Sequence, residues 1–124
     1  MPIFSAGSLA ACAVTLMCAG GQATPPGSSL VLTLHPEGGT PRSAVLLCDP
    51  ASGTHPEAEA ACDALEQADG DFARLPTEHR ACPMIHAPVR AEAHGTWRGE
   101  RVHFRTSYSN TCFAEAESSG VFAI

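Results

Sequence analysis

Lysine is absent from this chain, and its seven basic residues are all arginines, spread from Arg42 to Arg105 without a cluster. Nucleic-acid-binding proteins concentrate positive charge on one face. The formal net charge of −6 and the pI near 5.4 are the opposite of that footprint. We therefore expect no nucleic-acid partner.

The sequence settings of the common nucleophilic hydrolases are also missing. Serine, histidine and aspartate all occur, but the chain has no G-x-S-x-G and no comparable setting for a nucleophile. A single small domain within 124 residues also leaves little room for a substrate cleft. We therefore expect a protein that is not an enzyme and has no catalytic residues.

A zinc knuckle is missing as well, because no two of the six cysteines have the C-x₂₋₄-C spacing. The histidines, which are the other common zinc ligands, are scattered along the chain: His35, His55, His79, His86, His94 and His103. Zinc binding is the alternative role for these cysteines and histidines. We expect neither a metal nor another cofactor.

The N-terminal region lacks charge and lacks a membrane-spanning length of apolar residues. Residues 1–23 contain no charged residue, and the apolar run from Leu9 to Ala19 is too short to cross a bilayer. Gly21-Gln22-Ala23 then places small residues at the two positions that a signal peptidase reads. We predict a secretory signal peptide over residues 1–23, although no Lys or Arg precedes the apolar run. A lipid anchor at Cys18 is disfavoured, because a methionine stands where that signal needs a small residue.

Cleavage of this leader leaves a secreted, extracellular domain of residues 24–124, with no membrane partner. Four cysteines remain in it: Cys48, Cys62, Cys82 and Cys112. An even number of cysteines in an exported domain of this size indicates two disulfides. The spacing alone leaves all three pairings open.

Short apolar runs and alternating patterns predict a set of antiparallel strands. The expected strands are residues 30–34, 44–48, 89–94, 102–108 and 121–124. The turn material of residues 36–41 makes the first two strands a hairpin. Residues 95–99 are expected to turn the chain around Trp97, and Asn110-Thr111-Cys112 to close the fourth strand.

One helix is predicted between these strands. Thr54 is placed to cap it, with Pro56 in the first turn and Glu57 three residues after the cap. Asp69-Gly70 ends it. Its apolar side is formed by Ala58, Ala61, Cys62, Leu65 and Ala68. Several strands with one helix indicate the α+β class, in which a sheet is covered on one face by a helix.

The segment from Cys82 to Pro88 stands apart from these elements. Pro83 and Pro88 bracket it and keep it extended, since proline fixes its own φ and keeps the preceding residue out of the helical region. Between them lie Met84 and Ile85, two large apolar residues outside any apolar period. This pattern is typical of a substrate-like protease-binding loop. The alternative is that both residues belong to the core of an ordinary strand.

Three groups of motifs are spaced along residues 30–124. The first is Cys48-Asp49-Pro50 with Gly53-Thr54-His55-Pro56 and Ala61-Cys62-Asp63-Ala64-Leu65. The second is Cys82-Pro83-Met84. The third runs through Gly95-Thr96-Trp97-Arg98-Gly99 and Ser109-Asn110-Thr111-Cys112 to Ser118-Ser119-Gly120-Val121-Phe122. In this order and over residues 30–124, the chain resembles the Streptomyces subtilisin inhibitor family.

The resemblance implies the disulfides Cys48–Cys62 and Cys82–Cys112. It also implies a five-stranded antiparallel sheet covered by one main helix, a subtilisin-inhibitor-like sandwich. It further implies a homodimer that associates through the sheet.

The function implied by the resemblance is inhibition of extracellular subtilisin-like serine proteases. Met84-Ile85 is then the reactive-site bond, with Met84 entering the primary specificity pocket of the protease. The flanking protease-contact loop consists of Ala81, Cys82, Pro83 and His86. Asn110 matches the family asparagine that supports the loop from below; without the family, it is equally well a polar residue at a strand end.

Two positions depart from the family pattern. Ala81 is smaller than the apolar residue of the best-known relatives, and His86 replaces a usual aromatic residue. Two other functions stay open: a secreted, disulfide-stapled binding module whose loop inhibits nothing, and an inhibitor of another extracellular enzyme such as a metalloprotease.

Overall fold

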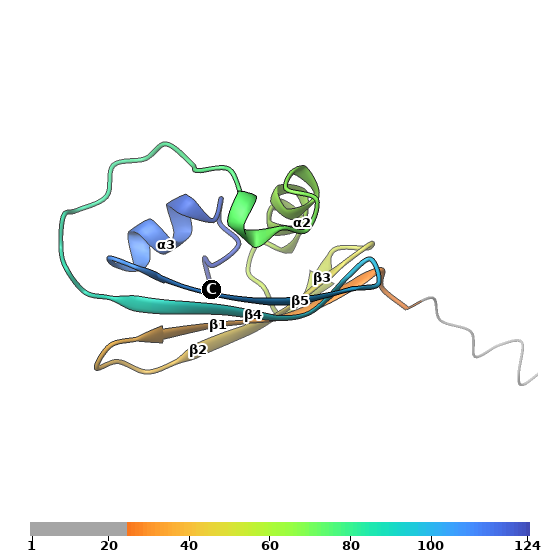
Figure 1. Ribbon diagram of the computed structural model, residues 1–124, viewed down its shortest axis with the longest axis horizontal. Coiled ribbons are helices and arrows are strands. Elements are labelled where there is room, and N and C mark those ends of the chain that lie inside the picture. Colours follow the sequence, from red (N-terminus) through yellow and green to blue (C-terminus); the bar gives the residue numbers. More distant parts are fainter. Residues whose placement is uncertain (1–24) are drawn as a thin grey trace, which may run out of the picture.

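The computed structural model describes residues 25–124 and shows a five-stranded antiparallel sheet with two helices on one of its faces (Figure 1). The strand order in the sheet is β3-β2-β1-β4-β5. The elements in chain order are β1 (Ser28–Pro36), β2 (Arg42–Cys48), β3 (Ser52–Gly53), α2 (Ala58–Gln67), the 3₁₀ helix η1 (Phe72–Arg74), β4 (Val89–Trp97), β5 (Glu100–Tyr108) and α3 (Thr111–Glu117). This architecture confirms the predicted α+β class, and the predicted leader lies outside the described residues.

β1 is the central strand, and its alternation sets the two faces of the sheet. Leu30, Leu32 and Leu34 are almost fully buried, whereas Val31 between them is exposed. Because successive side chains of a strand point to opposite faces, the three leucines face the helices. β1 pairs antiparallel with β2 on one side and with β4 on the other.

The β4–β5 hairpin has the predicted alternation but a tighter turn. Val89, Ala91 and Ala93 are buried, as expected. β4 continues through Gly95 to Trp97, so the turn consists of Arg98 and Gly99 rather than residues 95–99. This position of the strand requires glycine, because a Cβ at Gly95 would lie 2.0 Å from the carbonyl oxygen of Ser29 in β1. A close backbone approach therefore explains this glycine.

The helix α2 begins later than predicted. Its N-cap is Glu57, without a side-chain capping bond, so the prediction that Thr54 caps it is wrong. The Thr54 hydroxyl instead accepts a hydrogen bond from the Val45 N–H at 2.8 Å, which fastens the chain to β2. The buried side of α2 faces the sheet and carries Cys62, which is bonded to Cys48 of β2.

His55 joins the start of α2 to the C-terminal segment. It is 5% exposed, its Nδ1 accepts from the Glu57 N–H at 2.9 Å, and its Nε2 lies 2.8 Å from the carbonyl oxygen of Val121. Since Nδ1 is the acceptor, Nε2 carries the proton and donates to that oxygen.

The predicted terminal strand over residues 121–124 is wrong. Val121 and Phe122 are fully buried, but the backbone N–H groups of Val121 and Ala123 bond to Ser118 and Gly120, three residues earlier in each case. Because these N–H groups bond within local turns, the segment does not pair with a neighbouring strand. The fifth strand is β3, a two-residue edge strand beside β2. Phe122 fills the core, with its ring 6.0 Å from that of Phe72.

Candidate functional site

Residues 75–88 form neither helix nor strand and connect η1 to β4 by a wide path around α3 (Figure 1). Met84 is 91% exposed and Ile85 is 60% exposed. Two large apolar side chains in contact with water are unusual in a small domain, since burial of such groups stabilises the fold. The interpretation of both residues as part of a strand core is therefore wrong.

Asn110 holds the backbone on both sides of Met84. Its side-chain Nδ2 donates to the carbonyl oxygens of Pro83 at 3.0 Å and of Ile85 at 2.8 Å. Its Oδ1 accepts from the N–H of Phe113 at 3.1 Å and so caps α3. Asn110 is only 6% exposed, so these bonds are partly sheltered from water. One buried amide therefore couples the loop to the first turn of a helix.

The Cys82–Cys112 disulfide fixes the loop two residues before Met84. Its other half-cystine is the second residue of α3, and the two Cα atoms lie 5.7 Å apart. On the far side, the N–H of Ala87 donates to the carbonyl oxygen of Ser109 at 2.8 Å. The exposed residues 83–86 are thus held at both ends by residues that flank or begin α3.

Both cysteine pairs are those that the resemblance implies. The bridges Cys48–Cys62 and Cys82–Cys112 close segments with sequence separations of 14 and 30. In the chain-entropy account, each such bridge stabilises the fold by about 3 to 4 kcal/mol. The four cysteines within residues 25–124 all form disulfides, so none of these four is available as a metal ligand.

The remaining predicted site residues lie along the same exposed stretch. The side chains of Ala81, Pro83 and His86 are all exposed, and Cys82 is half-buried by its bridge. The structure therefore places the predicted contact residues along one continuous, largely exposed stretch of the loop. Their contact with a protease stays a prediction.

Sequence reasoning missed α3 and the charged residues that bind the loop to it. Arg80 donates from Nε to Oε1 of Glu78 at 3.0 Å and from NH1 to Oε1 of Glu115 at 3.3 Å. The hydrogen bond with Glu78 is the main cause that raises the pKa of Arg80 above its ordinary value. The available signal was Asn110 itself, an N-cap residue that precedes a run rich in alanine and glutamate.

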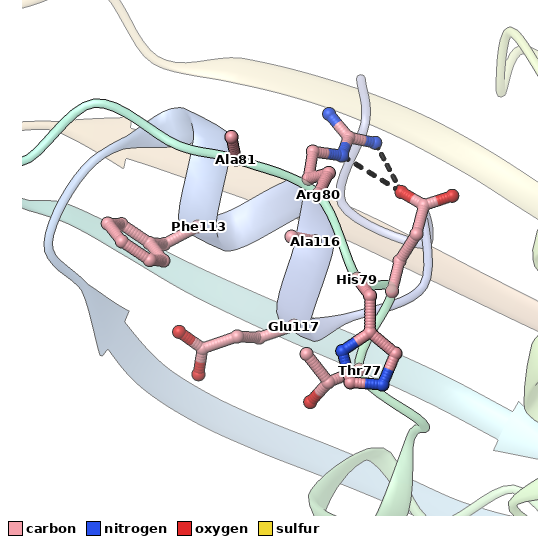
Figure 2. A pocket seen from close by; sticks show the side chains of 8 residues that line it. Thr77, His79, Arg80, Ala81, Phe113, Ala116 and Glu117 are labelled. Atoms are coloured by element: carbon pink, nitrogen blue, oxygen red, sulfur yellow. Dashed lines mark hydrogen bonds and ion pairs between the residues drawn. The ribbon is translucent and has the colours of Figure 1, made fainter.

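A groove of about 530 Å³ lies between the loop and α3 (Figure 2). Its lining comes from Thr77, Glu78, His79, Arg80, Ala81, Phe113, Ala116 and Glu117. Within residues 25–124, no group of three or more His, Cys, Asp or Glu side chains is arranged to hold a metal ion. In the same part of the chain, neither the length nor the apolar character of any helix suffices to cross a bilayer.

Comparison with known proteins agrees with this geometry. The family model for subtilisin inhibitor-like proteins matches residues 26–110. A crystal structure of Streptomyces caespitosus sermetstatin in complex with Bacillus licheniformis subtilisin has a TM-score of 0.61 and 39% identity. This similarity covers 78% of the present chain and 98% of that chain.

Individual relatives carry inhibitor names. The protease inhibitor SIL-V1/SIL-V4 of Streptomyces netropsis is 41% identical over 103 residues, which is 77% of this chain and 94% of that protein. The subtilisin inhibitor of Streptomyces albogriseolus is 42% identical over 84 residues, covering 66% of this chain and 58% of that protein. A Streptomyces avermitilis protein with a serine protease inhibitor name is 48% identical over 82 residues, covering 66% of this chain and 56% of that protein.

Proposed function

Because the chain belongs to the subtilisin inhibitor-like family, we propose that it inhibits subtilisin-type serine endopeptidases by offering them Met84-Ile85 as a substrate-like bond. As a member of that family it is a protease inhibitor and not an enzyme. The observation that carries the proposal is the position of Met84. Its side chain is 91% exposed, while Asn110 holds the carbonyl groups of both neighbours in place.

Met84 suits the primary specificity pocket of a protease with an apolar, roomy pocket. Methionine is unbranched, uncharged and adaptable, so it fills such a pocket without needing a matching charge. It offers no cation to an acidic pocket floor, so we expect weak inhibition of trypsin. The backbone of the contact residues Ala81, Cys82, Pro83 and His86 pairs with the protease as an added strand.

The same restraints explain why the bond resists permanent cleavage. Hydrolysis needs the amine of Ile85 to move away from the acyl group on Met84 after the bond breaks. The Cys82–Cys112 bridge restrains one side, and the bond from Ala87 to Ser109 restrains the other. The amine therefore stays close at high effective molarity, and re-formation of the peptide bond competes with attack by water. A stiff loop also loses little entropy on docking, so a standard-size interface binds tightly.

Secretion is part of the proposal, because the target proteases are extracellular. The apolar leader over residues 1–23 and the two disulfides support it, since disulfides persist in oxidising compartments. Cultures of a producing strain test it: the mature chain is expected in the medium, beginning at Thr24.

A homodimer through the open face of the sheet is also proposed. Val31 and Val45 are direct cross-strand partners on that face, with exposures of 46% and 37%. Adjacent exposed valines on the face opposite the helices favour self-association. Sedimentation of the wild type against Val31→Asp tests this: a shift from dimer to monomer supports it, and a monomeric wild type contradicts it.

Titration of subtilisin with the purified domain tests the inhibitory function. We expect stoichiometric inhibition by the wild type and a loss of at least about a hundredfold in affinity for Met84→Asp, because a charge enters an apolar pocket unpaired. Gln67→Glu is the matched control, since it adds the same charge at the exposed end of α2. Unchanged inhibition by a folded Met84→Asp protein would contradict the assignment of the reactive bond.

A further inference from the structure

Contacts between the loop and the segment that contains α3 are not limited to the disulfide and Asn110. Residues 76–87 run antiparallel to residues 109–119, and contacts occur at nearly every second position of the first segment. In order along the loop, these contacts are Ser119 Oγ to the carbonyl oxygen of Pro76, the N–H of Glu78 to the carbonyl oxygen of Ala116, Arg80 to Glu115, the Cys82–Cys112 bridge, Asn110 to Pro83 and Ile85, and the N–H of Ala87 to the carbonyl oxygen of Ser109.

The arm of the loop before the disulfide, residues 76–81, is held to α3 and the residues after it by noncovalent contacts alone. The N–H of Glu78 donates to the carbonyl oxygen of Ala116 at 2.7 Å. Between that bond and Cys82, Arg80 supplies the attachment to α3 through its NH1, 3.3 Å from Oε1 of Glu115. An extended segment has no internal hydrogen bonds, so its direction is set by such lateral contacts.

Arg80 is well placed to orient the arm. Its guanidinium bonds Glu78 on its own segment and Glu115 on α3, so it braces the arm against the helix. In Figure 2, Arg80 and Thr77 point to opposite sides of the extended segment, and the dashed lines mark the bonds from Arg80 to Glu78. Arg80 and Glu78 line the groove together with Thr77 and His79 of the same segment.

We propose that Arg80 is a positioning residue, whose ion pair with Glu115 holds the arm before Cys82 in the orientation that the reactive bond needs. The proposal rests on the inhibitory function given above. It assigns part of the stiffness of the loop to an electrostatic contact in addition to the covalent one. The side chains of Arg80 and Glu115 are 38% and 35% exposed, so the contact is partly screened by water and sensitive to salt.

Two variants, Arg80→Gln and Glu115→Gln, and their combination test this proposal against subtilisin. We expect each single variant to raise the inhibition constant and the rate of permanent cleavage at Met84-Ile85 by about three- to fivefold. The double variant is expected to do no more than Arg80→Gln alone, because that substitution already removes the contact with Glu115. Glu117→Gln is the matched control: Glu117 is exposed on the same helix and has no ion pair within residues 25–124.

A direct contact between Arg80 and the protease gives a different pattern. In that case Arg80→Gln weakens inhibition but Glu115→Gln does not, and the positioning role is overturned. Salt dependence separates the ion pair from a role in packing alone. We expect the differences in inhibition constant and cleavage rate between the wild type and the variants to disappear at about 1 M salt, where exposed charges are screened. A difference that persists at that concentration contradicts the ion pair as its cause.

Hydrogen exchange on the free inhibitor gives a readout without any protease. The amide of Glu78, which is bonded to Ala116, is expected to exchange at least about threefold faster in Arg80→Gln and in Glu115→Gln, and at the wild-type rate in Glu117→Gln. Unchanged exchange in both variants overturns the proposal. Failure of the wild type itself to inhibit subtilisin would instead overturn the proposed function, so the two outcomes are separate.

Discussion

The side-chain amide of Asn110 donates a hydrogen bond of 2.8 Å to the carbonyl oxygen of Ile85, while the oxygen of the same amide caps α3. The first turn of the helix and the backbone beside the proposed reactive bond therefore depend on one buried side chain. A change at Asn110 acts on both, and two variants separate the effects.

Asn110→Ala removes the cap and both donors, whereas Asn110→Asp keeps a capping oxygen but turns a carboxylate toward two carbonyl oxygens. We expect Asn110→Ala to lower the free energy of unfolding by about 1 to 3 kcal/mol, from the lost cap and the unpaired carbonyls. Both variants are expected to be cleaved at Met84-Ile85 at least about tenfold faster than the wild type. Denaturant unfolding and timed incubation with subtilisin measure the two effects. A wild-type cleavage rate for Asn110→Asp would show that the donors are dispensable.

Tyr108 provides a prediction at alkaline pH. Burial, with a smaller contribution from Glu117, raises its pKa from 10.0 to about 12. The folded state thus favours the neutral phenol more than the unfolded state does. The stability this provides is fully present below pH 10.0 and is lost as the pH rises toward about 12.

Tyr108 is the only tyrosine, so tyrosinate absorbance in the near ultraviolet reports it alone. We expect a midpoint near pH 12 in rapid-mixing titration, and a steady fall in thermal stability from pH 10 upward. Tyr108→Phe is expected to lack the part of that fall that comes from ionisation of the phenol. A midpoint near pH 10, as for a free tyrosine, would contradict the burial of this side chain.

Much of the fold could be predicted from local pattern. The short apolar run from Leu30 to Leu34 predicted β1 as a strand, and the alternation from Val89 to Ala93 predicted β4. The apolar run from Val121 to Ile124 was wrongly predicted as a strand. Short apolar runs carry no period, so a buried turn and a buried strand have the same pattern.

The contacts that hold the loop were harder to predict. Helix α3 has only seven residues, and its short pattern gives little helical period. Arg80 and Glu115 are 35 residues apart, and their pairing arises only after α3 has packed beside the loop. The roles of Cys82, Pro83 and Met84 could be predicted because the resemblance aligns these residues with the family. The ion pair between Arg80 and Glu115 could not, because it depends on the tertiary arrangement of this chain.

The proposed restraint of the reactive bond is tested most directly by the rate at which subtilisin permanently cleaves Met84-Ile85 once the Cys82–Cys112 bridge is removed. The variant Cys82→Ser/Cys112→Ser is compared with Cys48→Ser/Cys62→Ser, which loses the other bridge, at a temperature where circular dichroism shows both to be folded. We expect at least tenfold faster cleavage and weaker binding for the first variant, and cleavage near the wild-type rate for the second. A Cys82→Ser/Cys112→Ser protein that binds as tightly and resists cleavage as well as the wild type would contradict the proposal that this bridge restrains the reactive bond.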